Sequence, residues 1–392
     1  MTLSKKQLKQ KRQILEKMYA HGPISRIDLS KNLHITPATV SDITSVLINE
    51  RAIEEVGLDP SDTNVGRRKI LLSNLPKYTY YLGVELTQEY ITLAATDNLG
   101  EVINQTIQYN EENVQTTPKK IIQITESFIQ NLGDTEISGL GIAIPGYYDS
   151  TARVIQTDNP FWNQFNIGQI MEYFPFEVYC KNKVNCMAIG LRYFNNGDGE
   201  NDNFTLFHLR IGMSCAYMYN GNIYGEHNPH VGEIGHVTVD LNGTKCQCGN
   251  NGCLQTYIGQ SALIDKAKKL YHLDNSILNT IVEDADDVTL KEIILAYELG
   301  DSSILALIDL GLDALTKMIH NTGMIIDAYH IYIHGILFTN EHIRQRFFEK
   351  LGQNKDIFSF STSKTYDMLP YDIYDGAIGA CALSLYNDLL VG

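Results

Sequence analysis

One histidine and three cysteines near the middle of the chain have the types and the spacing of a metal site. His236 lies ten residues before Cys246, and Cys248 and Cys253 complete three cysteines within eight positions. Three thiolates and one imidazole supply the four tetrahedral ligands of a structural zinc ion. The alternative is that the cysteines gather in one loop by chance, inert or disulfide-bonded. We expect one Zn²⁺ per chain, with a structural role because protein ligands fill all four positions.

Two glycines favour the metal site over the chance cluster. Gly249 and Gly252 both lie between Cys248 and Cys253. A residue without a Cβ atom lets the backbone turn sharply, so that all three sulfurs can face one ion.

This loop also carries a family resemblance. Glu233-Ile234-Gly235-His236, followed by Cys246-x-Cys248-Gly249-x-x-Gly252-Cys253-Leu254, resembles the zinc signature of the ROK family, which holds repressors and sugar kinases. The resemblance covers nearly the whole chain and is strongest to the xylose-repressor and N-acetylglucosamine-repressor type. It implies an α/β fold with an N-terminal winged helix-turn-helix and a two-lobed, ribonuclease-H-like body, as in actin and hexokinase. It also implies sugar-binding residues, namely Asn159, Asn182, Glu233, His236 and Gln255.

The resemblance gives these residues roles. Asn182, Glu233 and His236 would contact sugar hydroxyls, with His236 bridging zinc and sugar through its two ring nitrogens. Gln255 stands where the family usually has Glu, and its amide can both donate and accept hydrogen bonds. Two alternatives stay open: Glu233 either contacts the sugar or orients the zinc histidine, and Trp162 either stacks on the sugar ring or packs between domains.

The phosphate-binding loops of active family members are altered here. The first loop resembles Asp-x-Gly-x-Thr in kinases, and this chain has Glu85, Thr87 and Glu89 at the matching positions. A backbone nest for phosphate needs glycine, and the carboxylate of Glu89 would repel the anion. The second loop resembles Gly-Thr-Gly-Ile-Gly and reads Gly212-Met213-Ser214-Cys215-Ala216, while a late glycine pair has become His334-Gly335.

The catalytic base is replaced as well. The base motif of kinases in this family resembles Asn-Asp-x-Asn, and the matching run in this chain is Asn182-Lys183-Val184-Asn185. A lysine ammonium has no lone pair with which to accept the proton of a sugar hydroxyl. The four departures together predict a protein that is not an enzyme.

Composition indicates a soluble globular protein. The 392 residues exceed one ordinary core, and no apolar run approaches the roughly 20 residues of a membrane span. Seven cysteines, three of them assigned to metal, favour a reducing cytoplasm. Residues 1–75 hold 12 Lys and Arg against 8 Asp and Glu, whereas the remainder holds 19 against 38. We therefore expect only the N-terminal part to approach a polyanion.

That N-terminal part reads as three helices and a hairpin. A helix is expected over 8–20, and a second from Arg26 to Asn32 with Ser25 as its cap and Ile27 and Leu29 facing inward. Thr36 and Pro37 predict the start of a third helix, which runs to about Asn49. Two strands, 53–56 and 69–72, then enclose a polar loop, as in a winged helix-turn-helix. The alternative is a protein-interaction module with a solvated basic loop.

The third helix and the hairpin supply the expected DNA contacts. The buried stripe of the third helix would be Val40, Ile43 and Leu47, which leaves small polar side chains on the open face to contact bases in the major groove. Basic residues on the returning edge of the hairpin would hold phosphates or enter the minor groove. The candidate DNA-binding residues are Thr36, Ala38, Thr39, Asp42, Arg67, Arg68 and Lys69.

The body is expected to consist of two lobes of one kind. Strand-like runs over 78–86, 90–96 and from 102, a helix at about 117–132 and a buried strand over 139–144 form the first half. A second meander spans 204–224, followed by a helix over 304–319 and a parallel strand over 330–335. The expected domains are 1–75 for the head, 76–190 for the first lobe with a C-terminal helix over 375–392, and 191–374 for the second lobe with the zinc site.

These observations predict a cytoplasmic, sugar-responsive transcription repressor that binds an inverted-repeat operator as a homodimer or tetramer. The effector would be a monosaccharide, and no membrane is involved. Two alternatives remain: an active ROK-type sugar kinase with a DNA-binding head, and a repressor controlled by a protein partner.

Overall fold

The computed structural model describes residues 4–60, 68–111, 116–157, 159–194, 202–354 and 364–391. The chain divides into two compact units. Unit 1 comprises Met1–Asp202 with Asp372–Gly392, and unit 2 comprises Asn203–Tyr371.

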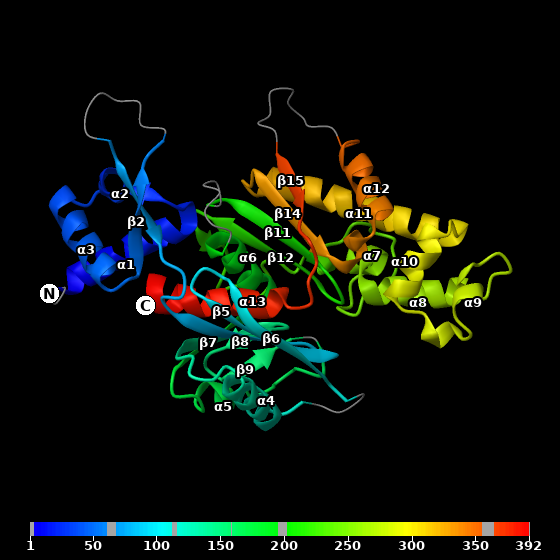
Figure 1. Cartoon of the computed structure of the whole chain (residues 1–392). Helices are drawn as coiled ribbons and strands as arrows, with labels where there is room; N and C mark the ends of the chain where they lie inside the picture. The colour runs from blue at the N-terminus through cyan, green and yellow to red at the C-terminus, as the bar shows by residue number, and fades with distance from the viewer. Residues whose placement is uncertain are drawn as a thin grey trace. The chain divides into compact units, whose positions relative to one another are not determined.

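The N-terminal part of unit 1, called the head below, contains three helices and a small sheet of order β1-β3-β2 (Figure 1). Ser25 caps α2 and Thr36 caps α3 through their hydroxyls, and Pro37 opens α3, as predicted. Helix α1 starts earlier than predicted because Ser4 and Gln7 form a reciprocal capping box. The elements are α1 (Lys5–His21), β1 (Ile24–Ser25), α2 (Arg26–Leu33), α3 (Pro37–Asn49), β2 (Ile53–Leu58) and β3 (Ile70–Asn74).

The core of the head confirms the predicted stripe of α3 and corrects one residue of α2. Val40, Ile43 and Leu47 are fully buried. Leu29 is also fully buried, but Ile27 is 51% exposed, so its predicted inward position was wrong. Residues two apart on a helix do not share a face, so the burial of Leu29 turns Ile27 toward solvent.

The remainder of unit 1, called the first lobe, is built on a sheet of order β10-β7-β4-β5-β6. Strands β4, β5 and β6 form the predicted antiparallel meander, and β7 and β10 add in parallel on the other side of β4. The elements are β4 (Tyr80–Leu86), β5 (Tyr90–Asp97), β6 (Val102–Tyr109), α4 (Pro118–Gln130), β7 (Ile137–Ile144), β8 (Tyr147–Asp149), β9 (Val154–Gln156), α5 (Gly168–Met171), β10 (Glu177–Asn182), α6 (Lys183–Tyr193), α13 (Asp375–Leu385) and a final π-helix (Tyr386–Val391).

Helix α13, red in Figure 1, packs directly on this sheet through strand glycines. A Cβ atom on Gly141 would lie 1.8 Å from the carbonyl oxygen of Ala380, and one on Gly83 would lie 1.8 Å from that of Ala377. The helix therefore touches the strands backbone to backbone, which only glycine permits at these two positions.

Unit 2 repeats the sheet of the first lobe. Its order is β13-β12-β11-β14-β15, with an antiparallel meander on one side of β11 and parallel β14 and β15 on the other. The same arrangement in both units confirms the expected two-lobed body. The elements are β11 (Phe204–Leu209), β12 (Met213–Tyr219), β13 (Asn222–Ile223), a 3₁₀ turn (Ile234–His236), α7 (Gln255–Ile258), α8 (Gln260–Leu270), α9 (Leu278–Ile281), a 3₁₀ turn (Ala285–Asp287), α10 (Leu290–Glu298), α11 (Ser302–Ile325), β14 (His330–Gly335), a 3₁₀ turn (Ile336–Thr339), α12 (Glu341–Leu351) and β15 (Thr365–Met368).

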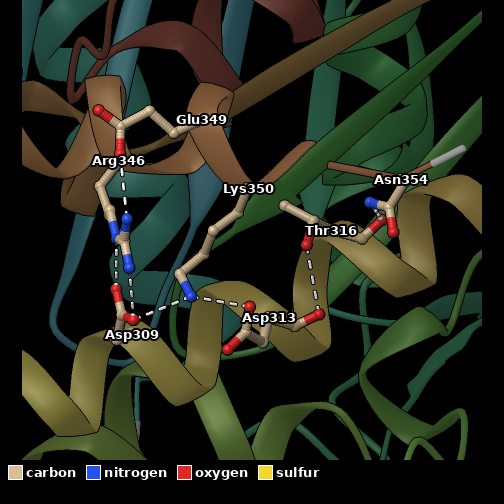
Figure 2. Close-up of polar contacts among 7 residues, drawn as sticks. All are labelled: Asp309, Asp313, Thr316, Arg346, Glu349, Lys350 and Asn354. Atoms are coloured by element: carbon tan, nitrogen blue, oxygen red, sulfur yellow. Dashed lines mark hydrogen bonds and ion pairs between the residues drawn. The ribbon is translucent and has the colours of Figure 1, made fainter. Parts of the chain in front are cut away.

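Helices α11 and α12 are joined by a network of charged side chains (Figure 2). Arg346 binds Asp309 through two parallel hydrogen bonds of 2.7 and 2.9 Å. The Lys350 ammonium lies 2.9 Å from Asp309 and 2.7 Å from Asp313. Because the Lys350 side chain is only 6% exposed, these carboxylates stabilise a cation that has little access to water.

Candidate functional site

The predicted metal ligands gather at one point of unit 2. The ligand atoms of His236, Cys246, Cys248 and Cys253 all lie within 4.8 Å of one another. Nδ1 of His236 is 3.7 Å from Sγ of Cys246, and Sγ of Cys248 is 3.7 Å from Sγ of Cys253. Four ligands at zinc–sulfur distances place neighbouring sulfurs about 3.8 Å apart, so the cluster fits a tetrahedral zinc ion. The sulfurs are too far apart for a disulfide, since that bond is about 2.05 Å long.

The loop that presents the cysteines depends on its two glycines, as predicted. Gly249 and Gly252 have φ angles of 91° and 65°, which L-residues rarely adopt. A Cβ atom on Gly252 would also lie 1.6 Å from the carbonyl oxygen of Asp240. Backbone hydrogen bonds from Cys246 N to Asn250 O and from Gly249 N to Cys246 O then close the turn.

Cys248 differs from the other two cysteines because it is exposed. The backbone N–H of Asn250, together with the neighbouring ligand groups, lowers the pKa of Cys248 to about 7. A thiol with this pKa loses its proton readily near neutral pH, as a metal ligand must.

Gln255 contacts the cysteine cluster, which the sequence did not reveal. Its Nε2 donates a hydrogen bond of 3.2 Å to Sγ of Cys246. An amide N–H can stabilise a thiolate, whereas the carboxylate of a Glu at this position would repel it. Glu233 immediately precedes the 3₁₀ turn that carries His236, so these candidate sugar residues are close neighbours of the metal cluster.

The other two candidate sugar residues, Asn159 and Asn182, lie in unit 1. Asn182 caps α6: its Oδ1 accepts from Val184 N at 3.0 Å and its Nδ2 donates to Gly146 O at 3.1 Å. Asn159 accepts from Phe161 N at 3.0 Å and donates to Gln88 at 3.4 Å. Each side chain is therefore held by one backbone N–H that follows it and by one acceptor earlier in the chain.

Trp162 is a core residue. Its side chain is fully buried in the core of the first lobe, edge-on to Phe161 and Phe165 at centroid distances of 4.9 and 5.1 Å. Both alternatives were therefore wrong: Trp162 neither stacks on a sugar ring in this conformation nor packs between domains, because the core of its own lobe encloses it.

An ion pair lies at the two positions that match aspartates in the motifs of the family kinases. The Lys183 ammonium is 2.6 Å from Oε1 of Glu85, whose side chain is fully buried. Thr92 donates a long hydrogen bond of 3.4 Å to the other oxygen of Glu85. Lys183 has no carboxylate, and its ammonium engages the carboxylate of Glu85.

The altered phosphate loops are ordinary strand connections. Thr87 closes the β4–β5 hairpin: its N–H and hydroxyl both donate to Tyr90 O, and its hydroxyl accepts from Tyr90 N. Met213 and Cys215 of the second loop point into the core as part of β12. At the late position, Nδ1 of buried His334 lies 2.9 Å from Nδ1 of His208 on the neighbouring strand.

The candidate DNA residues of the head lie at its surface where the structure describes them. Thr36, Ala38 and Asp42 are exposed and Thr39 is half-buried at the start of α3, on the side opposite its buried stripe. Arg68 is exposed, while the Lys69 ammonium is 2.9 Å from Asp28 of α2. Arg67 lies outside the described residues.

Comparisons with known proteins agree with this architecture. The chain is 30% identical over 269 residues to the xylose repressor of Bacillus subtilis (strain 168), covering 67% of this chain and 69% of that protein. It is 28% identical over 293 residues to the DNA-binding transcriptional dual regulator NagC of Escherichia coli (strain K12), covering 72% and 69%.

Solved structures share the fold over different lengths. A ROK family transcriptional regulator, a homolog of the E. coli MLC protein, has a TM-score of 0.76 at 22% identity and covers 98% of both chains. A ROK family glucokinase from Streptomyces griseus, in complex with glucose and AMPPNP, has a TM-score of 0.65 at 18% identity and covers 78% of this chain and 99% of its own. The ROK family model itself matches residues 81–385, far more than half of the chain, and this chain therefore belongs to the ROK family.

Proposed function

We propose that this protein is a transcription repressor that binds operator DNA through its head and senses a monosaccharide in a body that has lost kinase activity. The Glu85–Lys183 ion pair is the observation that carries the proposal, because it fills the catalytic position with a neutralised pair. The names of the relatives, a xylose repressor and a transcriptional regulator, support the same reading.

The head has the layout of a winged helix-turn-helix. Ala38 and Asp42 of α3 and its N-cap Thr36 are exposed and Thr39 is half-buried, and these side chains are small enough for close approach to base edges. Arg67 and Arg68 would hold phosphates from the hairpin. Lys69 belongs to the same set, although its ion pair with Asp28 makes it the weaker phosphate ligand.

Zinc would have a structural role in unit 2. The three thiolates and Nδ1 of His236 would fill the four tetrahedral positions of the ion, so no position would remain for a reacting group. The ion would fix the loop that carries His236 and the adjacent Glu233. Glu233→Gln distinguishes binding of a sugar hydroxyl by Glu233 from orientation of His236 alone. The glutamine keeps a hydrogen-bond acceptor for either role but weakens a charge-assisted hydrogen bond to sugar.

The sugar-binding set is Asn159, Asn182, Glu233, His236 and Gln255. Amide and carboxylate side chains of this kind bind vicinal hydroxyls by paired hydrogen bonds. Gln255 would then bind both the sugar and the Cys246 thiolate. Its N–H group donates a hydrogen bond to the sulfur, and its amide oxygen stays available to accept one from the sugar.

In solution the repressor would be a cytoplasmic homodimer, with a tetramer as a pair of dimers. One helix-turn-helix reads too few base pairs for useful specificity, so two heads would bind an inverted repeat. Among the described residues no helix is long and apolar enough to cross a membrane.

Two measurements test the proposal. Thermal shifts with D-xylose, D-glucose, N-acetyl-D-glucosamine and their phosphates should show a stabilising sugar, whereas ATP alone should have no effect because the phosphate nests are missing. Mobility shifts on the region upstream of the protein's own gene should show binding that the stabilising sugar changes. Phosphoryl transfer to any of these sugars would favour the kinase, and DNA binding unaffected by every sugar would favour a protein effector.

A further inference from the structure

The C-terminal end of helix α6 is tied to the first helix of the head. Nη2 of Arg192 lies 2.6 Å from Oε1 of Glu16 on α1, and the Tyr193 hydroxyl donates to the same oxygen at 3.4 Å. Nη1 of Arg192 also binds Asp202, which lies 3.4 Å from Nε2 of His21 on α1. The Arg192 side chain is only 3% exposed, so its charge depends on these carboxylates rather than on water.

A second set of contacts holds the same face of α1. The hydroxyl of Tyr19 accepts a hydrogen bond of 2.8 Å from Asn98 of the first lobe, and Tyr19 is 3% exposed. Asn98 also donates to Leu75 O and accepts from Tyr78 N, so it clamps the chain where head and lobe join. The head is thus held both at this junction and, through Arg192, on the flank of α1.

Helix α6 itself is fixed firmly to the lobe. A Cβ atom on Gly379 of α13 would lie 2.8 Å from the backbone of Cys186, so the two helices touch without intervening side chains. The side chain of Tyr193, next to Arg192, stacks on Tyr386 at 5.6 Å. Arg192 therefore projects from a rigid support, which is what a residue must do to orient another domain.

We propose that Arg192 is a positioning residue: its contacts with Glu16 and Asp202 fix the orientation of the DNA-binding head on the first lobe. The inference rests on the proposed function, because an oriented head matters only if the head binds DNA. The N-cap of α6 is Asn182, a candidate sugar residue about 15 Å from Arg192 at 1.5 Å per residue. Movement of this lobe on sugar binding would then carry the head with it instead of being absorbed at the junction.

Trypsin cleavage after Lys77 in the full-length protein measures docking of the head without DNA or sugar. Lys77 is exposed at the junction, and its N–H is bound to Asp97 at 3.0 Å, so cleavage requires local opening. Glu16→Ala removes the head's carboxylate and leaves Arg192 paired with Asp202. We expect cleavage about tenfold faster than in wild type, since a charge-assisted contact to a buried guanidinium is lost.

Two variants separate positioning from general stability. Glu16→Gln keeps an oxygen acceptor for Arg192 and should restore most of the protection. Glu172→Ala removes an ion pair with Arg153 elsewhere in the first lobe and should be cleaved at the wild-type rate. The urea unfolding midpoint followed by Trp162 fluorescence should be the same in all of them, because none of these residues belongs to the core around Trp162.

DNA selected from a random pool by the wild-type protein provides the second readout. The two half-sites of this DNA are moved apart by insertions of half and whole helical turns. Wild type should lose affinity for DNA with half-turn insertions. Glu16→Ala should discriminate about tenfold less between half-turn and whole-turn insertions, because its heads are free to reorient. Cleavage and spacing selectivity of Glu16→Ala equal to wild type would overturn the inference while leaving the repressor intact. Failure of wild type to select any DNA would instead overturn the proposed function, and the cleavage rates would still decide whether Arg192 docks the head.

Discussion

Removal of the Lys183 ammonium tests whether the buried ion pair of the first lobe is one interdependent feature. Lys183→Met keeps much of the side-chain volume and removes the ammonium that lies against the fully buried carboxylate of Glu85. At 2.6 Å the gross attraction is about 6 kcal/mol for an effective dielectric constant near 20. Most of this is offset by the desolvation of both ions, so the pair itself contributes little net stability.

The single variant should nevertheless lose much stability. Breaking a buried pair costs about 3–5 kcal/mol, because the remaining charge stays in a dry site without its partner. Lys183 is 18% exposed, so some water can reach the gap, and we expect the lower end of this range, about 3 kcal/mol. The double variant Glu85→Gln with Lys183→Met removes both charges and should lose clearly less than the single Lys183→Met.

Trp162 makes the assay specific. It is the only tryptophan and is fully buried in the core of the first lobe, so its fluorescence follows the unit that contains the ion pair. Urea unfolding of wild type, both single variants and the double variant gives a double-mutant cycle, provided the m-value stays constant. Coupling of about 2 kcal/mol or more is expected. Loss of less than about 1 kcal/mol in Lys183→Met, or single effects that simply add, would refute the reasoning.

Three further predictions concern the metal, the charge network and the sheet. Purified protein should contain about one zinc per chain, and Cys248→Ser should lose it; metal analysis with no difference between the two would contradict the site. Arg346 and Lys350 lower the pKa of Asp309 to about 2, the first of them dominating, so its contribution to stability is present above pH 4 and lost as pH falls toward 2. The melting-temperature difference between wild type and Asp309→Asn should therefore shrink over that window, and a constant difference would count against it. Gly141→Ala should lower the unfolding free energy by about 3 kcal/mol or more, because the new Cβ meets Ala380 O; a wild-type urea midpoint would show that α13 can move away.

The start of helix α3 in the head could be predicted from the sequence because it depends on local interactions. Thr36 and Pro37 predict the start of α3 because a hydroxyl cap and a proline act within one turn. The cysteine loop was equally readable, since its ligands and glycines lie within a few residues of one another. Ile27 was misplaced because only the docking of α2 decides which of two apolar neighbours turns inward.

Contacts between distant segments could not be predicted in this way. The sequence supported sugar stacking and interdomain packing of Trp162 equally, whereas the structure places it in the core of the first lobe. The hydrogen bond from Gln255 to Cys246 and the ion pairs of Arg192 with Glu16 and Asp202 depend on how loops and helices meet in space. No periodicity or motif in a single sequence encodes such pairings.

The Glu85–Lys183 pair changes how the proposed loss of kinase activity is understood. In the sequence, Glu85 and Lys183 are two separate departures from the kinase pattern, 98 residues apart. In the structure they are one feature, because a lysine at position 183 places its ammonium against the buried carboxylate at position 85. A carboxylate without the lysine, or the lysine without the carboxylate, would leave a charge without a countercharge in the first lobe. The same pair that would silence phosphoryl transfer thus holds β4 to the start of α6, the helix whose other end binds the head.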